Sequence, residues 1–219
     1  MRIRKRKMIF ALAAAAVTYT MTEEAKARAK EPKFRVLSRH GNCEIRLYPK
    51  IVVARVRVDG YRGSALNEGF RILAAYIFGK NKPAGREDEA SETHSLSTAS
   101  AKSKGQKIDM VAPVTIELEG RRWLITFIMP EQFAENIATL PAPIDNRIEI
   151  TQIEERKLAT IKFAGSASER QFTKKRDELL KLIGGMGMSA AGQSIHAYYN
   201  PPFALPFLKR NEVLIPITG

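Results

Sequence analysis

Few side chains in this chain could do chemistry, and they do not form a recognisable catalytic set. The three histidines, His40, His94 and His196, are scattered along the sequence, and Cys43 is the single cysteine. No glycine-rich phosphate loop follows a strand pattern, and no pair of histidines or acidic residues has metal-ligand spacing on a helix. A single cysteine excludes an internal disulfide and a multi-cysteine metal site. The absence of such a set does not exclude an enzyme, but nothing in these residues argues for one.

Two of the histidines could still serve as metal ligands. His196 shares one face of a predicted strand with Ser194 and Tyr198. As an iron ligand it would need that face to line a pocket, whereas a surface or hydrogen-bonded position is the more common environment of a histidine. His40 falls in a predicted hairpin turn, where a solvated side chain is expected.

The loop at 200–211 is unusually apolar. It contains three prolines, and its bulky side chains are Phe203, Leu205 and Phe207. Such residues are too large and too many for a solvated connector. They either plug one end of a barrel, which is the more common role of large apolar residues, or form the wall of a groove for a flat apolar ligand.

The elements that would position these residues show clear periodicity. Residues 107–118 alternate apolar and polar side chains, and residues 123–129 do the same after a turn at Gly120, which predicts a hairpin. Pro113 lacks an N–H group and should lie at an edge or a bulge of the sheet. Further strands are predicted at 34–37, 44–48, 52–58, 194–199 and 212–217.

Two helices are predicted from apolar residues at helical spacing. The first begins with Ser64 as its N-cap and ends at Gly79, whose backbone can adopt the left-handed conformation. The second begins at Ser168, which forms a capping box with Gln171, and ends at Gly184. The buried positions are Leu66, Phe70, Leu73 and Ile77 in the first helix and Phe172, Leu179 and Ile183 in the second.

The chain contains an internal repeat. Residues 44–60 match 149–165 at one constant offset of 105 positions, and a helix and a hairpin follow each copy. The fold class is therefore α+β. Two βαββ repeats are expected to form a distorted antiparallel β-barrel flanked by two helices.

The N-terminal segment differs in composition from the rest. The formal net charge is +13, and eight Lys or Arg against two Glu in residues 1–30 account for six of these charges. A cationic run at 2–7 followed by an apolar stretch at 8–17 is typical of a signal peptide or an N-terminal anchor. We expect an exported, periplasmic or extracytoplasmic protein with possible membrane association through this segment. Basic and aromatic residues are not interleaved on one face, so nucleic acid is not an expected partner.

The domain is expected to span residues 31–219 and to carry one insertion. Residues 80–106 are rich in Ser, Thr, Lys and Glu, and Leu96 is their only large aliphatic side chain. Such a segment cannot bury enough apolar surface to order itself, so we predict a disordered, solvated insertion.

Several motifs, in order along the chain, resemble the SOUL family of haem-binding proteins. The resemblance covers about residues 34–217 and implies reversible binding of haem or another tetrapyrrole, with no enzymatic activity. It implies a shallow apolar cleft between the first helix and the loop after the Tyr-Tyr-Asn-Pro-Pro motif. The matching motifs are Glu44-Ile-Arg-Leu-Tyr-Pro49, Tyr76-Ile-Phe-Gly-Lys-Asn81, Lys107-Ile-Asp-Met-Val-Ala-Pro-Val114, Tyr198-Tyr-Asn-Pro-Pro202 and Arg210-Asn-Glu-Val213.

The resemblance also implies the residues of the cleft. The loop residues would then form a wall and not a plug. Arg71, or Lys209 and Arg210 from the loop side, would pair with the haem propionates. The family has no fixed axial ligand, so His196 and His40 are both possible iron ligands. The helix positions that would face the cleft are Asn67, Phe70, Arg71 and Ala74.

Two other functions stay open. A ligand-sensing module similar to those of multidrug-responsive regulators would bind amphipathic cations and would need an acidic residue at the base of its pocket. The acidic residues considered for this role, Asp109, Glu117 and Glu149, are predicted to point outward. A hydrolase or chelatase acting on a pigment would need a catalytic group that the sequence does not reveal.

Overall fold

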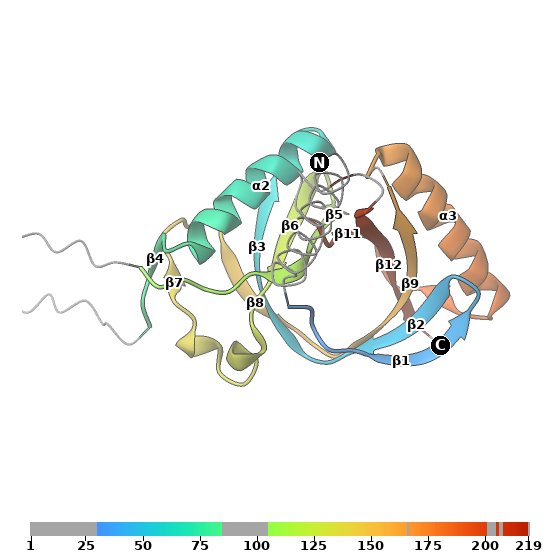
Figure 1. Cartoon of the computed structure of the whole chain (residues 1–219), viewed down its shortest axis with the longest axis horizontal. Coiled ribbons are helices and arrows are strands. Elements are labelled where there is room, and N and C mark those ends of the chain that lie inside the picture. Colours follow the sequence, from blue (N-terminus) through green and yellow to red (C-terminus); the bar gives the residue numbers. More distant parts are fainter. Residues whose placement is uncertain (1–29, 85–104, 166, 201–204, 206–207, 219) are drawn as a thin grey trace, which may run out of the picture. The chain divides into compact units, whose positions relative to one another are not determined.

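The structure is a computed structural model of the whole chain, and it describes most of the predicted domain (Figure 1). The predicted leader, most of the predicted insertion including His94, and the loop residues Phe203 and Phe207 lie outside the described residues. The described ranges are 30–84, 105–165, 167–200, 205 and 208–218.

The elements follow the predicted order of strands, helix and hairpin, twice. Within the described residues, the α-helices are α2 (Arg62–Ile77) and α3 (Glu169–Gly185), and the short 3-10 helices are η1 (Glu131–Phe133) and η2 (Ile137–Thr139). The strands are β1 (Arg35–His40), β2 (Cys43–Tyr48), β3 (Ile51–Val58), β4 (Asn81–Lys82), β5 (Val111–Glu119), β6 (Arg122–Ile128), β7 (Ala142–Pro143), β8 (Glu149–Ile153), β9 (Arg156–Ala164), β10 (Ser189–Ala190), β11 (Ile195–Tyr198) and β12 (Arg210–Thr218).

The two repeats interlock within one antiparallel sheet of order β1-β2-β9-β12-β11-β5-β6-β3-β8. The strands β2 and β3 are consecutive in the chain, yet β2 pairs with β9 of the second repeat and β3 pairs with β8. The sheet therefore curls into a distorted barrel, with α2 and α3 on its outer face (Figure 1). The predicted fold is confirmed.

Matching hydrogen bonds mark the same point in each repeat. Gly60 and Gly165 both adopt a left-handed backbone, with φ of 103° and 100°. The indole Nε1 of Trp123 donates to the carbonyl of Gly60 over 3.1 Å, and the side-chain amide of Asn211 donates to the carbonyl of Gly165 over 3.1 Å. Each helix thus follows an equivalent glycine turn, whose carbonyl accepts a hydrogen bond from a side chain.

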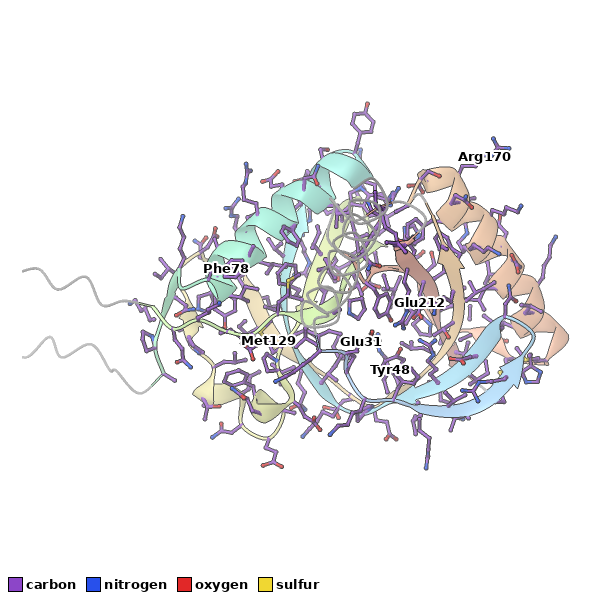
Figure 2. The ribbon with its side chains drawn as sticks, in the orientation of Figure 1. Glu31, Tyr48, Phe78, Met129, Arg170 and Glu212 are labelled. Carbon is purple, nitrogen blue, oxygen red and sulfur yellow. The ribbon has the colours of Figure 1, made fainter. Side chains whose placement is uncertain are left out.

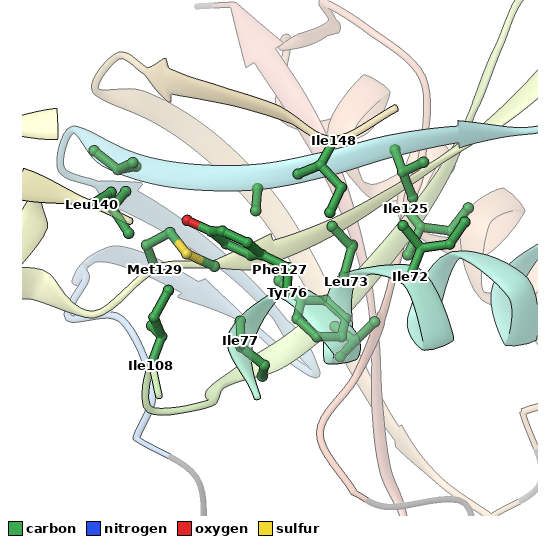
Figure 3. Close-up of a cluster of buried hydrophobic side chains, with 14 of the residues drawn as sticks. Ile72, Leu73, Tyr76, Ile77, Ile108, Ile125, Phe127, Met129, Leu140 and Ile148 are labelled. Atoms are coloured by element: carbon green, nitrogen blue, oxygen red, sulfur yellow. The ribbon is translucent and has the colours of Figure 1, made fainter. Parts of the chain in front are cut away.

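The helix α2 buries one face against β3 and β6 (Figure 3). Leu73 and Ile77 are almost fully buried, and each contributes about 1.5–3 kcal/mol through burial. The predicted N-cap is wrong: the helix begins at Arg62 with Tyr61 as N-cap, and the Ser64 hydroxyl donates back to the Tyr61 carbonyl. Gly79, with φ of 107°, follows the helix as predicted.

The helix α3 packs on the second half of the sheet as expected. The Ser168 hydroxyl accepts a hydrogen bond from the backbone N–H of Gln171 over 3.3 Å, which confirms the N-cap. Phe172, Leu179 and Ile183 are its buried residues. The two helices therefore cover two separate apolar clusters, one in each half of the barrel.

Pro113 lies at a bulge and not at an edge. The pairing of β5 with β6 shifts register between Val111 and Val114, and the Ala112–Pro113 bond is cis. The strand β5 itself is central, between β11 and β6. The bulge removes the need for a ladder hydrogen bond at the proline, so an interior strand tolerates it.

The two ends of the predicted insertion are ordered. Asn81 is buried, and its side-chain amide donates to the carbonyls of Tyr76 and Gln106 over 2.7 and 2.8 Å. The strand β4 pairs with β7. Residues 85–104 lie outside the described part of the chain.

Replacing Gly69 by alanine is expected to destabilise the domain. The added Cβ would lie 2.6–2.8 Å from side-chain atoms of Ile125. Such overpacking costs about 1–3 kcal/mol, which exceeds the gain of up to about 1 kcal/mol in helix propensity. Gly63→Ala is the matched control on the same helix, because nothing lies within 4 Å of its added Cβ. Denaturant unfolding should give a lower free energy of unfolding for Gly69→Ala than for Gly63→Ala. The reverse order would contradict the close contact of Gly69 with Ile125.

Candidate functional site

The N-terminal ends of α2 and α3 meet at Arg62. Its guanidinium donates to the Tyr198 hydroxyl and, over 3.1 Å, to the carbonyl of Ala167, and it forms an ion pair with Glu169. The side chain of Arg62 is only 13% exposed. It therefore ties the first helix to the start of the second across the central strands of the barrel.

An aromatic group lies beneath Arg62. The guanidinium carbon of Arg62 is 5.3 Å from the ring centroid of Phe172, and Tyr198 lies 5.3 Å from the same ring. Burial raises the pKa of the Tyr198 hydroxyl to about 12, so it stays protonated. Tyr198 packs against both apolar clusters, and it connects the two halves of the domain.

His196 stacks on Phe172 and is buried. The ring centroids are 4.1 Å apart, the planes differ by 10°, and His196 is 7% exposed. Its Nδ1 has no hydrogen-bond partner among the described residues. Burial lowers the pKa of His196 to about 4, and the positive charges of Arg62 and Arg176 act in the same direction. His196 is thus a neutral, enclosed histidine, not the surface histidine that was one of the two expected environments.

The pH dependence of stability should report His196. Its folded-state pKa of about 4 is below the unfolded value of 6.5, so the unfolded chain binds the proton first. The free energy of unfolding should therefore fall as the pH drops from 6.5 towards 4, by about 2 kcal/mol at pH 5. In His196→Phe, which keeps a ring on Phe172, denaturant unfolding should lack this contribution.

The control for that measurement is His40→Phe. His40 is exposed, and its Nε2 lies 3.2 Å from the hydroxyl of Ser38. This variant should keep the full decrease in stability between pH 6.5 and 5. An equal decrease in the wild type and in His196→Phe would mean that His196 is not the group that titrates. The titration of carboxylates should change the free energy of unfolding of all three proteins equally.

The predicted cleft residues of the first helix lie on α2. Asn67 and Arg71 are exposed, whereas Phe70 and Ala74 are half-buried against the cluster under the helix. The Phe70 ring lies 5.4 Å from Phe127 in an edge-on arrangement. This face of α2 therefore offers apolar side chains at its base and one arginine at its surface.

The two described leucines of the apolar loop are exposed. Leu205 and Leu208 are 55% and 50% exposed. The base of the loop is fixed beside the start of α3, because the backbone N–H of Gly165 donates to the carbonyl of Lys209 over 3.3 Å. The loop thus returns to the neighbourhood of the Arg62 contacts, at Ala167.

Arg210 points into the barrel. Along β12, Val213 packs under α3 while Leu214 packs in an inner cluster, so Arg210 and Glu212 share the inner face with Leu214. Arg210 forms ion pairs with Glu31 and Glu212, each at 2.8 Å. Its charge is therefore already balanced inside the barrel.

The buried acid that sequence reasoning missed is Glu212, which is 0% exposed. Arg46 donates to it over 2.8 Å and the Tyr199 hydroxyl over 2.7 Å. Burial raises its pKa, but the hydrogen bond and charge of Arg46, with the charge of Arg210, outweigh burial and lower the pKa below the usual value. Glu212 is ionised and fully paired.

The three acids considered from the sequence differ from Glu212. Glu149 pairs with Arg55 and Arg57, whose hydrogen bonds lower its pKa to about 2. Glu117 is half-buried, and burial raises its pKa. Asp109 is exposed. None of them is as deeply buried as Glu212.

The described ranges contain no cluster of three or more His, Cys, Asp or Glu that could hold a metal ion. Cys43 is buried as a free thiol, and burial raises its pKa. Within the same ranges, no helix is both long and apolar enough to cross a membrane. The best-defined arrangement of polar and aromatic side chains on the outer face is that of Arg62, Phe172, His196 and Tyr198.

The protein is thus a distorted barrel built from two interlocked βαββ repeats, with one helix on each flank. The chain belongs to the SOUL heme-binding protein family, whose model matches residues 29–216. No curated protein matches the chain.

Two solved structures of EcmrR show the same fold at low sequence identity. The C-terminal domain of EcmrR is 10% identical, with a TM-score of 0.54 over 80% of this chain and 96% of that one. EcmrR in a complex with DNA is 11% identical, with a TM-score of 0.52 over 99% and 69%. A hydrolase from Listeria innocua is 14% identical, with a TM-score of 0.49 over 90% and 98%.

Proposed function

We propose that the protein binds haem or a related tetrapyrrole without transforming it. The observation that carries this proposal is its membership of a heme-binding family over nearly the whole domain. The described residues support binding over catalysis, because His196, the buried histidine, stacks on a phenylalanine and no described nucleophile hydrogen-bonds to its Nδ1.

The proposed site lies between α2 and the loop after Tyr198. A tetrapyrrole is flat and apolar, and this region offers half-buried Phe70 and Ala74 together with exposed Leu205 and Leu208. Phe203 and Phe207, outside the described residues, belong to the same loop and would add to its wall. Apolar walls with a few charged groups at the edge are typical of ligand sites.

The exposed Arg71 is the better-supported partner for the propionates, and Arg62 would become one when a propionate takes the place of Glu169. Arg210 is engaged by Glu31 and Glu212 inside the barrel. Arg62 lies at the N-terminus of α2, where there is no side-chain cap and no acidic residue in the first turn. The partial positive charge of a helix N-terminus favours an anion there. Lys209 at the loop base stays a further candidate.

The iron has no evident ligand on the described surface of α2. His196 could reach it only by leaving its stack on Phe172. His40 lies on the edge strand β1, whereas α2 packs on β3 and β6. We therefore propose that the apolar contacts and the propionates hold the ligand, with His196 as an axial ligand only after Phe172 moves.

Binding of amphipathic cations is the alternative, and two observations favour it. The fold is shared with the EcmrR C-terminal domain, part of a DNA-bound protein, and Glu212 is a buried acid in the barrel. Glu212 is already neutralised by Arg46 and Arg210, however, so a cation would have to displace two arginines. The tetrapyrrole is therefore the better-supported ligand.

Titration of the full chain with haemin and, separately, with tetraphenylphosphonium distinguishes these ligands. A saturable shift of the haemin absorption at micromolar concentrations, with no heat of binding for the cation, is the expected result. Phe70→Ala and Arg71→Ala should each weaken haemin binding. Binding of the cation without haemin would replace the proposal, and unchanged affinity in both variants would place the site elsewhere.

We also propose export, with possible attachment to a membrane, on the basis of the cationic and apolar run at residues 2–17. Cell fractionation of the full chain should find it outside the cytoplasm. Deletion of residues 2–17 should retain it inside the cell, and an unchanged distribution would contradict this localisation.

A further inference from the structure

The first residues of the domain contact side chains on the inner face of the sheet. Residues 31–34, here called the strap, belong to no helix or strand and are held by side-chain contacts. The ring of Phe34 lies 5.1 Å from that of Tyr48 and 4.4 Å from the guanidinium carbon of Arg46. The strap therefore contacts the polar cluster around Glu212, through Phe34 on Arg46 and Glu31 on Arg210.

Glu31 places a carboxylate on Arg210. Nη1 of Arg210 donates to the two carboxylate oxygens of Glu31 over 2.8 and 3.0 Å. The guanidinium also lies 3.7 Å from the ring centroid of Tyr199. An arginine with an aromatic ring on one side and a carboxylate in front is a typical carboxylate-binding arrangement.

Glu31 is the carboxylate that a ligand could replace without a change of charge. Arg210 lies between Glu31 and Glu212, with an ion pair of 2.8 Å to each. A monocarboxylate that took the place of Glu31 on Arg210 would carry the same charge as the side chain it replaced.

A mostly apolar cavity, lined also by Glu154 and Arg156, lies beside Tyr48 of this cluster. Its volume is about 40 Å³, which is room for about one water molecule. Pro32 and Tyr48 line it together with Leu158, Ile195 and Leu214. Because Pro32 belongs to the strap, lifting the strap would remove this part of the cavity wall.

We propose that this barrel end is a second binding site, on the inner face of the sheet, for a monocarboxylate with an apolar tail. The ligand carboxylate takes the place of Glu31 on Arg210, and the tail enters the cavity when the strap lifts. The site differs from the proposed tetrapyrrole site, which lies on the outer face of the sheet. Glu31 is thus a built-in competitor that excludes weak carboxylate ligands.

Calorimetric titration of the full chain with decanoate, below its micelle concentration, tests this site. Glu31→Gln should bind decanoate about tenfold more tightly than the wild type, because the competing charge is gone. Decanol, which has the same tail and no carboxylate, should bind neither protein. Arg210→Gln should lose decanoate binding.

The matched control is Glu131→Gln. This variant removes the other ion pair of the strap, between Lys33 and Glu131. The side chains of Lys33 and Glu131 are 80% and 74% exposed, and the pair does not include Arg210. It should leave decanoate affinity unchanged. The proposal is overturned if Glu31→Gln binds decanoate no more tightly than the wild type, or if decanol binds equally well. The haemin affinity of Glu31→Gln should equal that of the wild type. The haemin and decanoate titrations therefore test the tetrapyrrole site and the carboxylate site independently.

Discussion

Replacing Glu212 by leucine is expected to lower the free energy of unfolding by about 3–5 kcal/mol. The substitution leaves Arg46 and Arg210 inside the barrel without the carboxylate that both contact at 2.8 Å. An uncompensated buried charge is among the most destabilising features a single substitution can create. Equilibrium denaturation in urea measures the loss.

A double-mutant cycle separates the pair from its surroundings. Arg46→Met alone should also destabilise the domain, and Arg46→Met combined with Glu212→Leu should recover part of the loss, with a coupling of about 1–3 kcal/mol. Glu149→Leu is the control, because Glu149 is 42% exposed and its arginine pairs are solvated, so its effect should stay below about 1 kcal/mol. Equal losses for Glu212→Leu and Glu149→Leu would contradict the account of the buried cluster.

Arg62 and Glu169 are expected to affect haemin affinity in opposite directions. If Arg62 pairs with a propionate, Arg62→Gln should weaken binding about tenfold, since a charge-assisted pair contributes about 1.5 kcal/mol or more. Glu169 holds Arg62 in an ion pair and adds a negative charge near the site. Glu169→Gln should therefore strengthen haemin binding, by several-fold. Fluorescence quenching by haemin gives both affinities.

Arg170→Gln is the matched control for these variants. Arg170 follows Glu169 in the first turn of α3, and it is exposed and directed away from the domain (Figure 2). It removes the same charge as Arg62→Gln without touching Tyr198 or Ala167. If Arg170→Gln weakens haemin binding as much as Arg62→Gln does, the effect is one of net charge and Arg62 has no specific role.

The fold follows from local patterns that the sequence displays openly. Alternation along 107–118 predicted the strand that ends at Glu119, and the spacing of Phe172, Leu179 and Ile183 predicted the buried face of α3. The repeat at an offset of 105 predicted two equivalent halves, which Gly60 and Gly165 confirm. These features depend on periods of two and 3.6 residues, which a single sequence carries.

Features that depend on contacts between distant residues could not be read in this way. Glu212 is paired with Arg46, 166 positions earlier, and Arg62 with Tyr198, 136 positions later. An acid in a predicted strand looks solvated unless its partner is known. The pairing of β2 with β9 and of β3 with β8 is likewise a property of the whole sheet, because each pair joins strands of different repeats.

The predicted site is a mixture of local and distant features. Asn67, Phe70, Arg71 and Ala74 share the accessible side of α2 because helical spacing dictates it. Arg210 was proposed as a free cation because its strand was expected to begin at Glu212, whereas β12 begins at Arg210, whose side chain faces inward. Arg62 could have been suspected from its place in the helix's first turn, once the Ser64 cap was discarded.

The most direct test of the central claim is a haemin titration of the wild type and of a Phe70→Ala, Arg62→Gln double variant, followed at the Soret band. The wild type should saturate at one haemin per chain with micromolar affinity, and the double variant should bind at least tenfold more weakly while keeping its near-ultraviolet circular dichroism. Absence of a saturable shift in the wild type, or equal affinity in the folded double variant, would contradict a tetrapyrrole site beside α2.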